Sequence, residues 1–154
     1  MLRPEEALAL PLTNGAVVAL GDDGLIAYCN PAALALLGWS SNLQGKSLSA
    51  VVPQRLQDKH HDAFAHFSTV RHPTTTYPRI QPALGEDGKE RNVQIAIVAY
   101  RRPDSSIFLC SALARPGAPW PSLEATHTEL IAHGYTVIEP KGEVLRIVVT
   151  GGRA

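Results

Sequence analysis

The feature that most constrains the fold of this chain is a series of short apolar runs joined by tight turns of glycine and acidic residues. The first two runs span residues 16–20 and 25–29, and the turn GDDG at 21–24 separates them. Connections this short join neighbouring antiparallel strands, and glycine allows the backbone angles that they need. This part of the chain therefore predicts a β-hairpin.

A second hairpin is predicted later in the chain, where GEDG at 85–88 joins residues 79–84 to residues 91–100. Its second strand alternates between two faces, with Val93, Ile95 and Ile97 on one and Gln94 and Ala96 on the other. Side chains alternate in this way along a strand that lies in a sheet. The apolar run 107–113 follows after a turn and is predicted to be a fifth strand.

Helices are predicted between the two hairpins. Asn30 and Pro31 provide a helix cap followed by proline at the first helical position, and the helix 32–37 is expected to stop at Gly38. A short helical turn is expected over 48–52 and a longer helix over 54–70.

The order of elements predicts an α+β fold, with five antiparallel strands and helices on one face of the sheet. The proline-rich stretch ARPGAPWP reads as a linker, and Ser122 is expected to cap a helix that runs to His133 and leads into a last hairpin, 135–139 with 144–150. The expected division is a leader (1–14), a main domain (15–113), a linker (114–121) and a helix–hairpin extension (122–154).

Charge and hydropathy exclude several classes of protein. The formal net charge is 0 and the basic residues are not clustered, which argues against nucleic-acid binding. No apolar stretch approaches the roughly 18 residues of a membrane span, and the start does not resemble a signal peptide, so a cytoplasmic protein is expected. Cys29 and Cys110 lie in apolar runs and are expected to be reduced, buried thiols.

The segment from Pro53 to Arg79 is expected to contact whatever the protein binds. It holds four of the six histidines, at positions 60, 61, 66 and 72. At helical spacing, one inward face would carry Leu56, His60, Phe64 and Phe67.

Four stretches, in this order and spacing, resemble the PAS family of sensor domains. They are VVALGDDGLIAYCNPAALALLGW, LQGKSL, VVPQR followed by a histidine and two phenylalanines, and EDGKERNVQIAI. The resemblance covers residues 15–113. It implies a five-stranded antiparallel sheet over helices, a ligand cavity between the sheet and the long helix, and a sensory or interaction role without catalysis. It also implies a homodimer. Because the chain carries no recognisable kinase, cyclase or DNA-binding output, the signalling output is expected on a separate protein.

The resemblance extends in part to bacterial oxygen-sensing PAS domains that bind haem b. It implies that His60, seven residues after Pro53, ligates the haem iron, with His61 as the alternative ligand. It implies that Arg79, eight residues before Asp87, hydrogen-bonds bound oxygen or a haem propionate. Four apolar or aromatic residues would line the haem: Phe64, Tyr77, Ile95 and Ile97.

This assignment agrees with the chemistry of the side chains. A neutral imidazole on an apolar helix face can give one nitrogen to ferrous iron, and an arginine offers several donors to a partly negative group. An alternative remains open, in which the domain binds no haem and serves as an interaction and dimerisation module, empty or with a small apolar ligand. A zinc site is disfavoured because His60 and His61 point to different helix faces.

Overall fold

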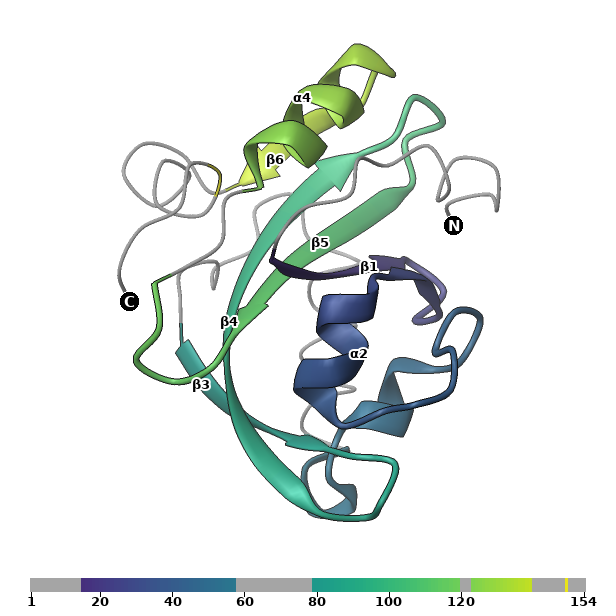
Figure 1. Ribbon diagram of the computed structural model, residues 1–154. Helices are drawn as coiled ribbons and strands as arrows, with labels where there is room; N and C mark the ends of the chain where they lie inside the picture. Colours follow the sequence, from purple (N-terminus) through teal and green to yellow (C-terminus); the bar gives the residue numbers. More distant parts are fainter. Residues whose placement is uncertain (1–14, 58–78, 120–122, 140–148, 150–154) are drawn as a thin grey trace.

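The protein is described by a computed structural model, which covers residues 15–57, 79–119, 123–139 and 149 (Figure 1). Its centre is an antiparallel sheet with the strand order β2-β1-β5-β4-β3. In chain order these strands are β1 (Ala16–Gly21), β2 (Ile26–Cys29), β3 (Arg79–Leu84), β4 (Glu90–Arg101) and β5 (Ile107–Ala114). Both predicted hairpins and the fifth strand are confirmed.

Helix α2 (Pro31–Leu37) begins where the sequence predicts, because Asn30 caps it. The Asn30 side-chain oxygen accepts hydrogen bonds from the backbone N–H of Ala33 at 3.0 Å and of Val17 at 2.9 Å. Its side-chain amide donates to the carbonyl of Gly15 at 2.8 Å. One buried asparagine therefore fixes both the start of α2 and its place beside β1.

The other end of α2 is held by Gly38 and Arg91. Gly38 has φ +79°, a left-handed conformation that glycine adopts without strain, and it ends the helix. The Arg91 guanidinium donates to the Leu37 carbonyl at 2.8 Å and forms an ion pair with Asp87. It lies so close to Gly38 that a Cβ atom there would collide with it. Arg91 thus ties the end of α2 to the β3–β4 turn.

The sheet has an apolar cluster on each face. The face toward α2 is called the inner face, and the opposite face the outer face. The inner cluster of buried residues comprises Ala16, Val18, Leu20, Ile26, Ala33, Leu37, Leu43, Ala83, Val93, Ala99, Ile107, Leu109 and Leu113. The outer cluster comprises Val17, Ala19, Ala27, Ala96, Val98, Tyr100, Phe108, Cys110, Ala112, Ala114, Leu123, Leu130, Tyr135 and Val149. Alternation along β4 and β5 divides their side chains between the two clusters, as the sequence predicts for β4.

The C-terminal part packs on the outer face. Helix α4 (Glu124–Ala132) gives buried Leu130 to the outer cluster, and β6 (Thr136–Glu139) pairs with the end of β4, from Ala99 to Arg101 (Figure 1). The sequence predicted β6 as part of a separate hairpin, but β6 extends the main sheet as its sixth strand. The expected partner strand, 144–150, lies outside the described residues apart from Val149, which is helical, so the prediction of a strand is wrong at that position.

Two local predictions need correction or completion. The N-cap of α4 is Leu123, which makes no side-chain capping bond, so the helix starts later than the expected cap Ser122, itself outside the described residues. The turn predicted over 48–52 is the 3-10 helix η1 (Leu48–Val51), and a second one, η2 (Gln54–Leu56), opens the predicted long helix. Within the described ranges, no helix is long and apolar enough to cross a membrane.

Candidate functional site

The middle of β4 is incompletely covered on the inner face. Val93 and Ala99 are 1% and 0% exposed, whereas Ile95 and Ile97, which lie between them on the same face, are only partly buried. Helix α2 packs on the same face, mostly against β1, and makes few contacts with β4 (Figure 1). The described residues therefore leave an apolar surface in the centre of the sheet partly uncovered, and such a surface can take an apolar ligand.

One polar side chain lies among these apolar residues. Ser111 on β5 pairs directly with Ile97 of β4 and, on its other side, with Val18 of β1, so it belongs to the inner face. It is 8% exposed, and its hydroxyl makes no hydrogen bond with another described residue. A hydroxyl in this position offers one donor and two acceptors to a ligand. The sequence analysis did not identify Ser111, although it lies two positions from both Leu109 and Leu113 and therefore on the same face of the strand.

Three of the seven predicted site residues fall within the described part of the chain. Ile95 and Ile97 lie on the inner face, as expected, and the backbone of Arg79 lies directly opposite Ile95 in the β3–β4 ladder. Residues directly opposite in an antiparallel pair share a face of the sheet, so the register brings positions 79, 95 and 97 together. The other four predicted residues, His60, His61, Phe64 and Tyr77, lie outside the described residues.

Both ends of the histidine-rich segment are anchored beside this face. Before the segment, Arg55 forms an exposed ion pair with Glu90 at the start of β4, and the Gln57 amide donates to the carbonyls of Ser49 and Val52 at 3.2 and 3.1 Å. Gln57 has helical backbone angles, φ −62° and ψ −42°. After the segment, the chain enters β3 at Arg79. The described residues on either side of 58–78 therefore both lie beside the β3–β4 part of the sheet.

The outer face is closed by polar contacts as well as apolar ones. The Tyr100 hydroxyl and Nδ1 of His127 share a hydrogen bond of 2.7 Å between β4 and α4. The Gln94 side chain accepts from the N–H of Gly117 at 3.1 Å and donates to the carbonyl of Ala118 at 3.0 Å. Burial raises the pKa of Tyr100 well above its usual range and lowers the pKa of His127, which favours the neutral form of both.

Some polar groups on the outer face remain unsatisfied. The Arg102 guanidinium is 5% exposed and lies 5.2 Å from the centre of the Phe108 ring, and its Nε and Nη2 atoms have no hydrogen-bond partner within the described ranges. Burial lowers the pKa of Arg102. The Tyr28 hydroxyl on the same face is likewise buried without a described partner. These groups are covered by the chain, so they do not form an open site.

The cysteines and acidic residues do not suggest redox or metal chemistry. Cys29 packs with the inner cluster and Cys110 with the outer one, and both are free thiols. Burial raises the pKa of Cys29 to about 11 and that of Cys110 to about 12, so neither is a thiolate at neutral pH. Among the described residues, no group of three or more histidine, cysteine or acidic side chains could hold a metal ion.

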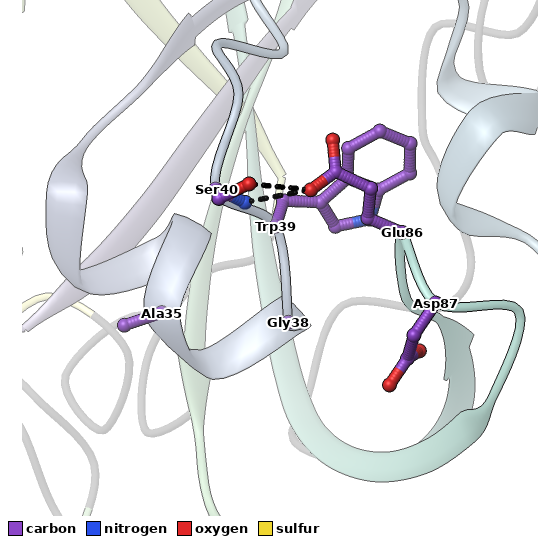
Figure 2. Close-up of a pocket in the computed structure, with 6 residues that line it drawn as sticks. All are labelled: Ala35, Gly38, Trp39, Ser40, Glu86 and Asp87. Atoms are coloured by element: carbon purple, nitrogen blue, oxygen red, sulfur yellow. Dashed lines mark hydrogen bonds between the residues drawn. The ribbon is translucent and has the colours of Figure 1, made fainter.

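A separate recess lies between the end of α2 and the β3–β4 turn (Figure 2). It has a volume of about 470 Å³ and is lined by Ala35, Gly38, Trp39, Ser40, Glu86 and Asp87. The Trp39 indole N–H donates to the Leu84 carbonyl at 3.1 Å. The sequence analysis did not identify this recess, because it forms only when the turn packs against the helix.

Comparisons with known proteins agree on the fold. A family model described as the PAS fold matches residues 8–113. The PAS-B domain of Cycle from Drosophila melanogaster, in a variant with bound glycerol, superposes with a TM-score of 0.53 at 12% identity, covering 64% of this chain and 97% of that chain. The PAS domain of BvgS from Bordetella pertussis superposes with a TM-score of 0.51 at 16% identity, covering 73% and 84%. The search of curated protein sequences finds no match.

Proposed function

The chain belongs to the PAS family, and we propose that it is a non-catalytic sensory domain in bacterial signal transduction that binds a small ligand on the inner face of its sheet. The observation that carries this proposal is the open centre of the inner face, where Ile95 and Ile97 are only partly buried between fully buried neighbours. Burial of apolar surface drives binding of small ligands, and the few polar groups in such a site orient them.

Haem b is the first ligand to test. The residues that fit this cofactor are the apolar pair Ile95 and Ile97, which would pack against the porphyrin, and Arg79, whose backbone lies opposite Ile95. His60 would hold the iron, with His61 as the alternative, and Phe64 and Tyr77 would complete the apolar lining. Haem would supply a centre that responds to a diatomic gas or to redox state. The chain's part is to orient the cofactor and exclude water from it.

Absorption spectroscopy of the protein expressed with added haem tests this assignment. A Soret band at roughly 400–430 nm is expected for histidine-ligated haem. His60→Ala should remove the band, whereas His133→Ala, which changes an exposed histidine of α4, should leave it unchanged. A protein that shows no band even after haemin is added would contradict haem binding. A band that survives in the double variant His60→Ala/His61→Ala would contradict the assignment of the iron ligand.

A small apolar ligand other than haem is the second candidate, and Ser111 favours it. Its hydroxyl faces the partly open centre, directly opposite Ile97, and has no hydrogen-bond partner among the described residues. A ligand with an apolar body and one polar group would match this surface. Mass spectrometry of molecules extracted from the purified protein would identify such a ligand, and an empty extract would contradict this candidate.

The signal is proposed to pass through a homodimer to a separate output protein, in the cytoplasm. The packing of α4 and β6 bears on this step, because α4 covers part of the outer face and β6 occupies the edge of β4 from Ala99 to Arg101 (Figure 1). A dimer would therefore use other surfaces than the centre of the outer face. Light scattering during gel filtration, with and without ligand, tests the dimer, and a monomer in both states would contradict it.

A further inference from the structure

The recess at the end of α2 combines an aromatic ring with a fixed carboxylate. Figure 2 shows the Glu86 carboxylate beside the Trp39 ring at the mouth of this recess. The indole N–H bond to the Leu84 carbonyl fixes the ring, and the backbone N–H of Glu86 donates to the Gly38 carbonyl at 3.2 Å. These two hydrogen bonds therefore join the end of α2 to the β3–β4 turn, and neither involves the open surface of the recess.

Neutral donors hold the Glu86 carboxylate in place. One oxygen accepts from the backbone N–H and the hydroxyl of Ser40, at 3.1 and 2.6 Å, and the other accepts from the Ser41 hydroxyl at 2.5 Å. These bonds lower the pKa of Glu86, so the group is ionised at neutral pH. Each carboxylate oxygen has two lone pairs, so this arrangement leaves acceptor capacity free.

The negative charge of Glu86 is not neutralised by an ion pair with any described residue. Asp87, the other acidic residue of the recess, is paired with Arg91, and Arg91 also binds the Leu37 carbonyl at the end of α2. The charges of Asp87 and Arg91 cancel, whereas Glu86 has no ion pair with a described residue, and only the more distant charge of Lys46 acts on it. The C-terminal end of a helix adds a small negative potential at the same place.

We propose that this recess binds a basic side chain of a partner protein, and that an arginine guanidinium is the group it recognises. The planar guanidinium stacks on an aromatic ring while its N–H groups donate to a carboxylate, and Trp39 and Glu86 present both features together. Because Glu86 and Trp39 are already fixed, little conformational entropy is lost when the side chain binds. The site uses none of the residues proposed above to contact the ligand, although Trp39 also packs against the inner cluster.

Two model compounds that differ only in charge provide the test. The probe is Nα-acetyl-arginine amide, and the control is Nα-acetyl-citrulline amide, which has the same shape without the charge. Titrations followed by NMR should shift the indole N–H signal of Trp39, assigned by its loss in Trp39→Phe, and the Ser40 amide signal. The citrulline compound should bind about five- to thirty-fold more weakly, the usual range for losing a charge-assisted contact and a cation–π contact.

A variant within the recess and a control variant elsewhere show whether arginine binding depends on the Glu86 charge. Glu86→Gln keeps a hydrogen-bond acceptor but removes the charge, and it should weaken arginine binding by a smaller factor than the citrulline substitution, because the cation–π contact with Trp39 remains. Asp23→Asn changes an exposed acidic residue of the other hairpin turn, whose carboxylate accepts from Leu25, and should leave binding unchanged. The indole signal of the unliganded Glu86→Gln protein reports whether the recess is intact. Equal binding of the two compounds, equal loss in Asp23→Asn, or no shift at all would overturn the proposal.

Discussion

The two faces of the sheet are closed to different extents, although the same strands form both. On the outer face, α4 and residues 117–118 pack over a cluster in which Tyr100 and Phe108 are both 0% exposed, and hydrogen bonds of His127 and Gln94 hold these segments in place. On the inner face, α2 leaves Ile95 and Ile97 partly open. Among the described residues the outer face is therefore the more fully buried of the two, and the inner face is the one on which we propose that a ligand binds.

The largest expected contrast is in the free energy of unfolding. Phe108→Ala removes a fully buried ring that lies 5.5 Å from the ring of Tyr135, and it should lower the free energy of unfolding by about 3–5 kcal/mol. Ile97→Ala on the inner face should cost only about 1–2 kcal/mol, because its side chain is not fully buried. Urea denaturation measures both values. Equal losses would show that the two faces contribute equally to stability.

A smaller effect is expected where the linker meets the sheet. Gln94→Leu removes both hydrogen bonds to residues 117 and 118 and leaves the Gly117 N–H without its acceptor, at a cost of about 1–3 kcal/mol. The matched control, Gln44→Leu, changes an exposed glutamine and should alter stability little. If urea denaturation gives the same stability for both variants, the linker is not held to β4 as described.

Stability should also depend on pH through the outer face. Burial lowers the pKa of His127 below its ordinary value, so the contribution of this residue is present above pH 6.5 and is lost as the pH falls through the folded-state pKa. Urea denaturation at pH 7.5 and pH 5 should show a drop in stability that is smaller in His127→Asn, which cannot be protonated. An identical drop in both proteins would assign the acid sensitivity to other groups.

The smallest effect on stability is expected at Ser111. Its hydroxyl has no described hydrogen-bond partner, so Ser111→Ala should change the free energy of unfolding by less than about 0.5 kcal/mol. The same variant should weaken binding of a ligand that bonds this hydroxyl. Calorimetry with the extracted ligand measures that change, and unaltered affinity would remove Ser111 from the site.

Local signals in the sequence were sufficient for the hairpins and for α2, because each depends on neighbouring residues. The GDDG and GEDG turns, the cap at Asn30 and the stop at Gly38 each act within a few positions, and the alternation of β4 places Ile95 and Ile97 on one face. The haem ligand and the domain boundaries stay predictions.

Features that depend on distant residues could not be predicted in this way. The pairing of β6 with Ala99–Arg101 joins segments far apart in the chain, and the recess at Trp39 needs Glu86 to pack against α2. Ser111 was missed because β5 is buried along its whole length, so its composition shows little alternation. Arg91 carries no local signal for its role at the end of α2.

Native mass spectrometry of the protein purified from cells grown with haem tests the central claim most directly, because it detects any ligand without assuming its identity. The wild-type spectrum should show a bound small molecule. Ile97→Trp, which fills the open part of the inner face, should remove it, while Ile131→Trp on the exposed side of α4 should retain it. A protein that carries no ligand, or a ligand that Ile97→Trp binds as well as wild type, would contradict the assignment of the inner face as the ligand-binding surface.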